Sequence, residues 1–303
     1  NVFFLSKRKG LDLSIFYKLF KIIKKTNPDV IHSHRYVLQY LFPILLFKKI
    51  KTIHTVHNVA EKEVPKRLQY IQKILFKKKI VIPVAISELV KKSICDLYDM
   101  NENDVPIIYN GVDLSKCYKN DEGTEKIILN IGRFAEQKNH IEMIEIFEEC
   151  LKIDSKIKLI LVGNGPLLEE VKKYAENKKV DESITFIKSI ESSYELLSKV
   201  DIFIMTSKWE GMPMSIIEAM GSGVPCIAYP VGGIPDMIND GIDGFLPKNK
   251  DEFVSKVIKV IKDESVRLYL GKNARINSQR FSSILMAEKY IKLYNDEREK
   301  LYV

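Results

Sequence analysis

The chain has 303 residues, 46% of them hydrophobic and 29% charged, a composition typical of a soluble globular protein with room for two domains. Its net charge of +8 is uneven, because residues 1–117 hold 21 Lys and Arg against 10 Asp and Glu, which gives +11 there and −3 in the remainder. The longest apolar run, residues 36–47, contains Gln39 and Pro43 and is too short to cross a bilayer, which argues against a membrane-spanning protein.

The first part of the chain alternates predicted strands and helices. Residues 2–5 predict a strand, and residues 12–25 predict an amphipathic helix that Asn27-Pro28 ends. Residues 29–34 and 51–56 predict two further strands with polar ends. This alternation indicates a parallel sheet, whose strand carboxyl ends are where ligands bind. Four of the five histidines lie on or just after the last two strands: His32, His34, His54 and His57.

The histidine pairs raise the question of a zinc site, since paired imidazoles bind zinc. His32 and His34 share one face of a strand, because side chains alternate along it. No cysteine or evident carboxylate ligand accompanies them in the sequence. A metal site is therefore the less favoured interpretation. For His57, a purely structural role remains an alternative, as a hydrogen-bonded residue at a strand end.

The middle of the chain indicates a change of domain. It predicts a basic amphipathic stretch, a strand and a helix capped by Ser87, at residues 63–78, 80–86 and 88–98. The sequence Asn110-Gly-Val-Asp113 follows, and the polar run 116–126 is typical of a linker. We therefore expect one domain over residues 1–117 and a second from residue 118.

The second domain restarts the alternation with a strand at residues 126–131, which leads into Gly132-Arg133 and Lys138. Two cations on a loop between a strand and a helix can converge on one diphosphate, Arg133 as a two-pronged donor and Lys138 as a point charge. After the next strand, residues 163–166 read Gly-Asn-Gly-Pro. The proline and the absent third glycine argue against a dinucleotide fingerprint, and so against a dinucleotide-dependent oxidoreductase.

Residues 201–221 combine a predicted buried strand, an open turn and a helix. Gly211 and Pro213 stand where the helix begins, and the free amides and dipole of a helix N-terminus suit a phosphate. Glu210 and Glu218 lie on either side of this candidate phosphate site in the sequence. Carboxylates repel phosphate and suit sugar or ribose hydroxyls, although two glutamates at this spacing are also common on any solvated helix.

The clearest family resemblance lies in residues 207–225, which read Ser-x-x-Glu-Gly-x-Pro-x-Ser-x-x-Glu-Ala-Met-x-x-Gly-x-Pro. This phrase resembles the signature of retaining GT-B glycosyltransferases of family 4, also called group 1 glycosyl transferases. The resemblance covers most of the chain, because further family motifs match residues 29–34, 55–57, 110–113 and 132–138.

The resemblance implies an α/β protein of the GT-B fold, with two Rossmann-like parallel-sheet domains facing a cleft. Residues 1–117 would form the acceptor-side domain and residues 118–282 the domain that binds the nucleotide sugar. Residues 283–303 would form a C-terminal helix that crosses back to the first domain. Nothing in residues 1–28 matches the family's first βα unit, so we expect the first domain to be incomplete by about two such units.

The resemblance also implies a role for each matched residue. His57 and Glu210 would be catalytic, with both of them at the donor sugar. Glu218 would bind the ribose of the nucleotide. The donor diphosphate would be bound by Arg133, Lys138, Gly211, Met212 and Pro213.

The implied activity is transfer of a sugar, with retention, from a nucleotide-diphosphate sugar to a glycan or lipid-linked acceptor in surface polysaccharide biosynthesis. A UDP-sugar is the expected donor. The sequence contains no Asp-x-Asp, so the motifs require no metal ion, and no cofactor is expected. A nucleotide-sugar 2-epimerase of the same fold and an inactive nucleotide-binding chain remain alternatives.

Charge and cysteine content bear on location and partners. The four cysteines are scattered without CxxC spacing, which favours reduced thiols in the cytoplasm. The basic first domain indicates an anionic partner, either a membrane surface or nucleic acid, although lysines on solvated faces give the same excess. No nucleic-acid-binding motif accompanies the charge, so we expect peripheral contact with the inner face of the plasma membrane.

Overall fold

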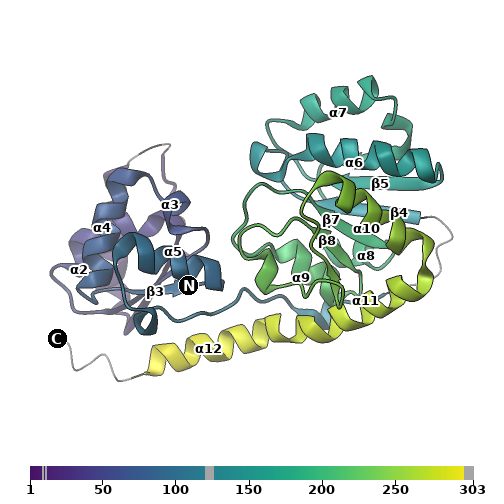
Figure 1. The fold of residues 1–303 in the computed structure, drawn as a ribbon. Helices are drawn as coiled ribbons and strands as arrows, with labels where there is room; N and C mark the ends of the chain where they lie inside the picture. The colour runs from purple at the N-terminus through teal and green to yellow at the C-terminus, as the bar shows by residue number, and fades with distance from the viewer. Residues whose placement is uncertain (9, 11, 120–125, 297–303) are drawn as a thin grey trace. The chain divides into compact units, whose positions relative to one another are not determined.

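The structure is a computed structural model that describes the chain except for residues 9, 11, 120–125 and 297–303. It divides into two compact units. Unit 1 comprises residues 1–109 with 288–303, and unit 2 comprises residues 110–287. Each unit is built on a sheet of parallel strands with helices packed around it, which confirms the α/β class that the alternating pattern predicts (Figure 1).

The sheet of unit 1 has the order β1-β2-β3, formed by Val30–His34, Lys51–Val56 and Ile82–Ala85. All its strands are parallel, and His34 at the end of β1 lies opposite Thr55. Strand β2 is buried along all but its first position, as expected for a β-branched strand in the middle of a parallel sheet. His34 and His57 therefore emerge at the same carboxyl edge of the sheet.

The helices of unit 1 largely follow the predicted ranges. Ser87 caps the helix after β3 as predicted, since its Oγ accepts a hydrogen bond of 3.2 Å from the Val90 amide. Most of the basic stretch 63–78 forms one helix, which begins at Lys66 because Val64 and Pro65 before it are extended. The helices are α1 (Ser14–Thr26), α2 (Leu38–Leu45), α3 (Ala60–Glu63), α4 (Lys66–Lys77) and α5 (Glu88–Tyr98).

The predicted strand over residues 2–5 is wrong, because the backbone there is irregular. Strand β1 lies at the edge of the described sheet and pairs with β2 alone, so this segment has no strand beside it. A strand needs neighbours to satisfy its backbone groups, whatever its side-chain pattern. Here the Leu5 carbonyl instead accepts a hydrogen bond of 2.7 Å from Lys18 Nζ.

The sheet of unit 2 has the order β6-β5-β4-β7-β8-β9, and all its strands are parallel. The chain moves from β4 to β5 and β6 on one side, and then returns to β7 on the other side of β4. The order of the strands therefore reverses at β4, and the crevice beside such a reversal is where open α/β sheets bind ligands. The strands are β4 (Lys126–Ile131), β5 (Ile157–Val162), β6 (Ile184–Ile187), β7 (Ile202–Met205), β8 (Cys226–Ala228) and β9 (Gly244–Phe245).

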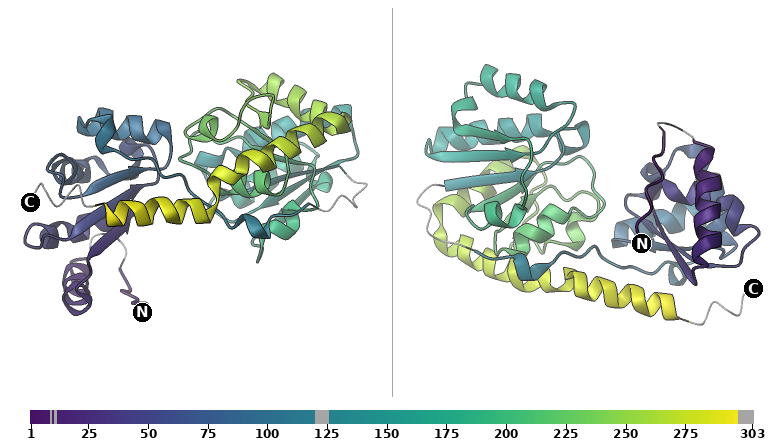
Figure 2. Two further views of the ribbon diagram at one scale, coloured as in Figure 1. Left: turned by 90° about the horizontal axis from the view of Figure 1, so that it is seen from below. Right: turned by 180° about the vertical axis from the view of Figure 1, so that it is seen from behind.

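Helices cover both faces of the unit 2 sheet (Figure 2). One face carries α6 (His140–Ile153), α7 (Leu168–Asn177) and α10 (Lys250–Lys262), and the other carries α8 (Ser193–Leu197), α9 (Met214–Gly221) and α11 (Glu264–Ser278). The central strands are consequently apolar on both sides, and Leu159, Ile204, Phe147 and Phe253 belong to one fully buried core.

Helix α12 (Ser283–Asn295) begins in unit 2 and ends in unit 1. Its last turns are bound to the unit 1 sheet, because Tyr290 and Thr55 share a hydrogen bond of 2.7 Å between hydroxyl oxygens, and Tyr294 Oη lies 2.7 Å from His32 Nδ1. The end of the helix predicted over residues 283–303 lies outside the described residues, which stop at 296. No helix in the described ranges is long and apolar enough to span a bilayer.

Candidate active site

The loops that follow β4 and β7 meet at the carboxyl edge of the unit 2 sheet, where the strand order reverses. The Lys208 amide donates a hydrogen bond of 2.8 Å to the Gln137 carbonyl, and Thr206 Oγ1 donates one of 3.0 Å to the Asn139 carbonyl. The two loops are far apart in sequence, and these bonds hold them side by side. They carry Lys138 and Glu210, two of the predicted site residues.

Lys138 and Glu210 form an ion pair with 2.6 Å between Nζ and Oε1. Their side chains are 15% and 7% exposed, so water screens the pair little. The family resemblance implies that Lys138 binds a diphosphate and Glu210 a sugar, and the structure places the two side chains in direct contact. A donor phosphate at Lys138 would compete with Glu210 for the same positive charge.

Two amide side chains that the sequence analysis did not single out support the β7 loop. Gln137 Nε2 donates hydrogen bonds of 2.8 Å to the Trp209 carbonyl and 3.3 Å to Glu210 Oε2. Asn110 Nδ2 donates one of 3.2 Å to the Met212 carbonyl. In the sequence, only their positions could have indicated this role. Gln137 stands directly before Lys138, and Asn110 lies in the predicted crossing between the domains.

Helix α9 begins at Met214, one residue later than the predicted first turn at Pro213. The reason is the extended backbone of Pro213, with ψ 119°, which makes it the N-cap. The amides of Met214 and Ser215, as the first residues of the helix, have no carbonyl four residues back within it. They therefore form a seat for an anionic oxygen next to Gly211 and Met212.

Three glycines pack against the backbone of these site loops. A Cβ at Gly163 would lie 1.9 Å from the Gly132 carbonyl oxygen, and one at Gly165 would lie 2.2 Å from that of Phe134. Gly232, with φ +61°, approaches so closely that a Cβ would lie 1.7 Å from the Glu210 carbonyl oxygen. The two glycines of the Gly-x-Gly turn after β5 thus allow the loops of the site to pack closely against each other.

Arg133 and Glu218 lie on either side of this cluster in the sequence. Arg133 is exposed on the β4 loop, whereas Glu218 is half-buried on α9. Burial raises the pKa of Glu218, and the Ser193 hydroxyl partly offsets the effect by hydrogen bonding to the carboxylate. Burial and the charge of Glu218 together raise the pKa of Tyr194 to about 12. Glu218 thus faces the start of α8.

The remaining predicted residue, His57, belongs to unit 1. Its Nε2 lies 2.9 Å from His34 Nδ1, a hydrogen-bonding distance. Burial, followed by the nearby charges of His34 and Arg35, lowers the pKa of His57 to about 4. The imidazole is therefore neutral at pH 7, and one of the two paired nitrogens carries the proton while the other accepts.

The other histidines of unit 1 are bound to hydroxyl groups. His54 is buried with Nδ1 at 2.9 Å from Ser33 Oγ, and His32 Nε2 lies 2.8 Å from Thr55 Oγ1. Burial lowers the pKa of His54 to about 3 and that of His32 to about 4. In the part of the chain that the structure describes, no group of three or more His, Cys, Asp or Glu could hold a metal ion.

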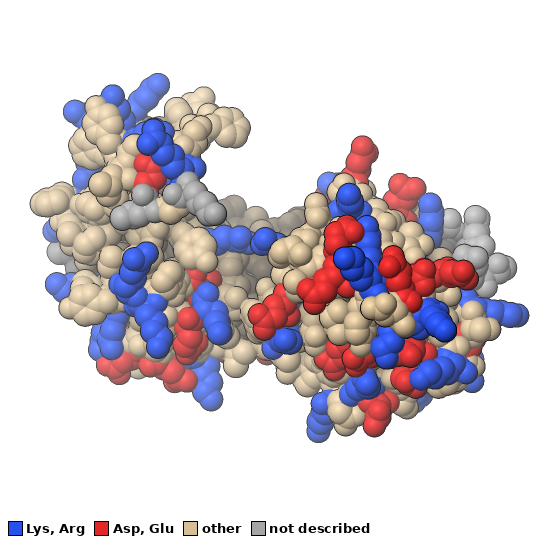
Figure 3. Space-filling model, turned by 90° about the horizontal axis from the view of Figure 1, so that it is seen from above, with Lys and Arg blue, Asp and Glu red and all other residues tan. Residues whose placement is uncertain are grey.

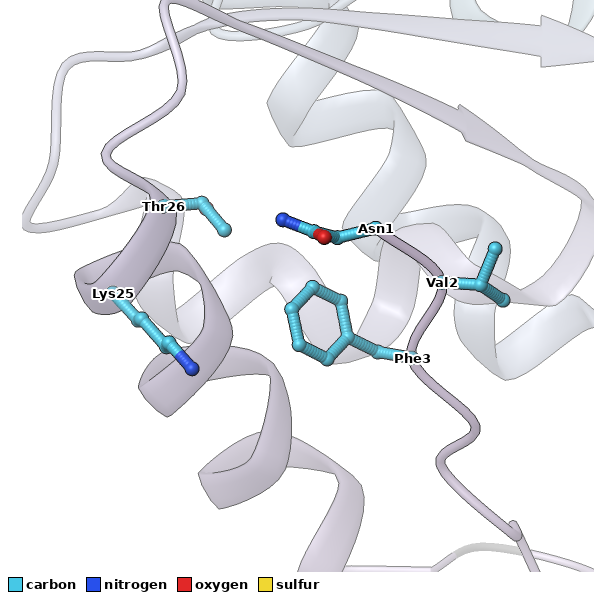
Figure 4. A pocket seen from close by; sticks show the side chains of 5 residues that line it. All are labelled: Asn1, Val2, Phe3, Lys25 and Thr26. Atoms are coloured by element: carbon cyan, nitrogen blue, oxygen red, sulfur yellow. The ribbon is translucent and has the colours of Figure 1, made fainter.

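The structure thus brings together Lys138, Glu210 and the turn at Gly211, Met212 and Pro213 within unit 2. His57 belongs to unit 1. A separate pocket in unit 1 contains none of these residues. It is lined by the N-terminal residues and the end of α1, namely Asn1, Val2, Phe3, Lys25 and Thr26 (Figure 4).

Comparison with known proteins identifies the family of both parts of the chain. Residues 117–277 match the model of glycosyl transferases group 1, and residues 1–116 match that of Glycosyltransferase Family 4. N-acetyl-alpha-D-glucosaminyl L-malate synthase of Bacillus anthracis is 26% identical over 94% of this chain and 79% of its own length. The UDP-Gal:alpha-D-GlcNAc-diphosphoundecaprenol alpha-1,3-galactosyltransferase of Escherichia coli is 28% identical over 94% of this chain and 80% of its own length.

A solved structure supports the same assignment at the level of the fold. The crystal structure of Anabaena Alr3699/HepE in complex with UDP and glucose superposes with a TM-score of 0.82 at 18% identity, over 91% of this chain and 80% of that one. The two parallel-sheet units accordingly have the GT-B fold expected from the sequence. With more than half of its length matched by one family model, the chain belongs to the glycosyl transferases group 1 family.

Proposed function

We propose that the protein transfers a sugar, with retention, from a UDP-sugar to a glycan or lipid-linked acceptor in surface polysaccharide biosynthesis. The observation that carries the proposal is the buried Lys138–Glu210 pair next to the N-terminus of α9, at the reversal point of the unit 2 sheet. Cationic and amide donors there suit a diphosphate, and a carboxylate suits a hydroxyl. The names of the relatives support UDP and a lipid-linked acceptor, since the Escherichia coli relative is named for UDP-Gal and diphosphoundecaprenol.

In this proposal the donor diphosphate is bound by Arg133, Lys138 and the amides from Gly211 to the start of α9. Arg133 is exposed and available as a two-pronged donor, whereas Lys138 is already held in place by Glu210. Negative charge grows on the phosphate as the sugar departs, and fixed donors aimed at it stabilise the transition state. These groups supply the positive charge that the proposal requires, so it requires no metal ion.

The proposed reaction replaces one bond at the anomeric carbon of the sugar. The bond to the β-phosphate oxygen breaks, and a bond to the acceptor hydroxyl oxygen forms on the same face, which retains the configuration. The acceptor hydroxyl proton passes to the departing phosphate oxygen. Glu210 accepts hydrogen bonds from the donor sugar, Glu218 from the ribose, and neutral His57 contacts the sugar at the reacting centre.

A binding screen followed by a transfer assay tests the proposal. UDP, UDP-glucose, UDP-galactose, UDP-N-acetylglucosamine and GDP-mannose should be compared by thermal shift, because a ligand at about 100 times its Kd stabilises the folded state by about 2.7 kcal/mol. The donor that binds is then incubated with an undecaprenyl diphosphate-linked sugar, and the product is analysed by mass spectrometry and NMR.

The expected result is a shift with at least one UDP-sugar and a product of retained configuration. An inverted product would contradict retention. A donor epimerised at C2 without transfer would support the nucleotide-sugar 2-epimerase instead. Absence of any shift would contradict the nucleotide assignment, and binding without turnover would support an inactive chain.

A further inference from the structure

The two oxygens of the Glu210 carboxylate are held by two consecutive residues. Lys138 Nζ lies 2.6 Å from Oε1, and Gln137 Nε2 lies 3.3 Å from Oε2. The same Gln137 amide donates a shorter bond of 2.8 Å to the Trp209 carbonyl, next to Glu210 in the chain. Gln137 thus binds both the side chain and the backbone at this point of the β7 loop.

The backbone of Gln137 makes a further bond to the same loop, because its carbonyl accepts the Lys208 amide at 2.8 Å. Gln137 therefore has three bonds to residues 208–210, spread over its side chain and main chain. The short 3₁₀ helix η4 (Glu136–Lys138) fixes its backbone. A side chain anchored in this way defines the orientation of the Glu210 carboxylate as well as its position.

Lys138 alone does not define that orientation. An ammonium group is a point charge on a flexible stem, and it holds a carboxylate oxygen at a distance without fixing the plane of the group. When a diphosphate binds, Lys138 acquires a second anionic partner and its hold on Glu210 weakens. The neutral amide of Gln137 has no such competing charge, so its bond to Glu210 persists.

We infer that Gln137 is a positioning residue for sugar transfer, which holds Glu210 toward the donor sugar while Lys138 shares its charge with the donor diphosphate. The inference rests on the proposed function, because it assigns no separate ligand to Gln137. It predicts that loss of the amide affects the step in which Glu210 contacts the sugar and leaves binding of free UDP unchanged. A misplaced group at a reacting centre costs rate even when binding persists.

The test compares Gln137→Leu, which keeps the size of the side chain and removes its donor, with Gln279→Leu as the matched control. Gln279 lies in the same unit on the short helix η7 (Gln279–Phe281) and is exposed, and its side-chain amide donates a hydrogen bond of 3.5 Å to the Arg275 carbonyl. Gln137→Leu should lower kcat about tenfold, the effect of one lost hydrogen bond in the transition state. The Kd for UDP should match that of the control, while the Tm should fall slightly because the bond to the Trp209 carbonyl is lost.

Each other outcome has a definite meaning. Unchanged kcat in Gln137→Leu, with an active wild type, would overturn the inference and leave the proposed function intact. A loss of UDP affinity in parallel with the loss of kcat would show a merely structural role for the loop contact and would also overturn the inference. A wild type that turns over no nucleotide sugar would contradict the proposed function and the inference together.

Discussion

Lys138 has both a structural role and a proposed role in binding the donor. Its ammonium neutralises a carboxylate that is 7% exposed, so its removal would leave Glu210 buried without a counter-charge. Breaking one side of such a pair is costly, because the remaining charge keeps its desolvation penalty. Arg133, on the same loop, is exposed, so its removal has no comparable cost in stability. The two cations assigned to the diphosphate should therefore respond differently to mutation.

Arg133→Ala and Lys138→Ala should each weaken UDP binding by about 1.5–3 kcal/mol, the range for a hydrogen bond to a charged group. Lys138→Ala should also lower the Tm, whereas Arg133→Ala should leave it within the error of the wild type. Calorimetry measures the affinity and thermal unfolding measures the Tm. Unchanged UDP affinity in both variants would remove the phosphate assignment.

The two glutamates should separate donor binding from turnover. Glu218→Gln should weaken binding of the donor and of free UDP alike, because both carry the ribose assigned to Glu218. Glu210→Gln should spare free UDP, since the change leaves Lys138 without its carboxylate partner and available to the phosphates. It should lower kcat, the pattern of an interaction used mainly in the transition state.

Calorimetry and initial-rate measurements on the two variants, made side by side, check this separation. If Glu210→Gln loses UDP affinity while Glu218→Gln keeps both affinity and rate, the two roles are assigned wrongly.

The sequence predicted a set of candidate site residues but not the contacts between them. Most of these residues were proposed because they stand just after a strand or at the start of a helix, positions that local pattern reveals. The Lys138–Glu210 contact joins positions 72 residues apart, and it depends on β4 and β7 being neighbours in the sheet. No local pattern contains that information, and the same reason explains why Gln137 and Asn110 were missed.

At the scale of elements, strands with a buried apolar pattern were predicted closely, and errors arose where the decisive factor was not local. Residues 2–5 have the composition of a strand but no partner in the described sheet. Helix α9 starts after Pro213 because of a backbone angle that residue identity does not report.

The strand pair β1–β2 should make stability depend on pH. His54 is buried in it with a pKa lowered to about 3, against about 6.5 in the unfolded chain. Between these values the unfolded chain binds the proton and the folded chain does not, so stability is complete above pH 6.5 and falls as the pH drops toward 3. His32 and His57, with pKa values lowered to about 4, act in the same direction.

The Tm of the wild type should consequently be lower at pH 5 than at pH 7.5. In His54→Asn the difference should be smaller, because one of the buried imidazoles is gone. Ser33→Ala is the matched control, since it removes the hydroxyl at 2.9 Å from His54 Nδ1 and keeps the titrating ring. Thermal unfolding followed by circular dichroism measures all three, and an equal pH dependence in wild type and His54→Asn would contradict the explanation.

At the scale of the whole molecule, alternating strands and helices predicted two parallel-sheet units but not their strand order. Right-handed crossovers limit the arrangements without choosing among them. The reversal at β4 follows from the return of the chain from β6 to β7, which pairs with β4 on the side opposite β5. The site could therefore be assigned to strand carboxyl ends from sequence, but not to the crevice beside β4.

Charge also differs between the parts of the molecule. On the face shown in Figure 3, acidic and basic side chains are interspersed over unit 2, as its charge balance requires. In unit 1, Phe47 is 89% exposed just after α2 and is followed by Lys48 and Lys49. An exposed aromatic ring beside two lysines suits the interface of an anionic bilayer, where the ring enters the headgroup region and the ammonium groups meet lipid phosphates.

We therefore expect the protein to bind vesicles that contain phosphatidylglycerol, and the bound fraction to fall as salt screens the charges. Each lysine near an anionic surface contributes about 1 kcal/mol, so replacing Lys48 and Lys49 with alanine should lower the partition coefficient about 30-fold. Replacing Lys172 and Lys173 of α7 in unit 2 is the matched control and should change it little. Co-sedimentation measures the bound fraction, and equal binding to neutral and anionic vesicles would rule out an electrostatic membrane contact.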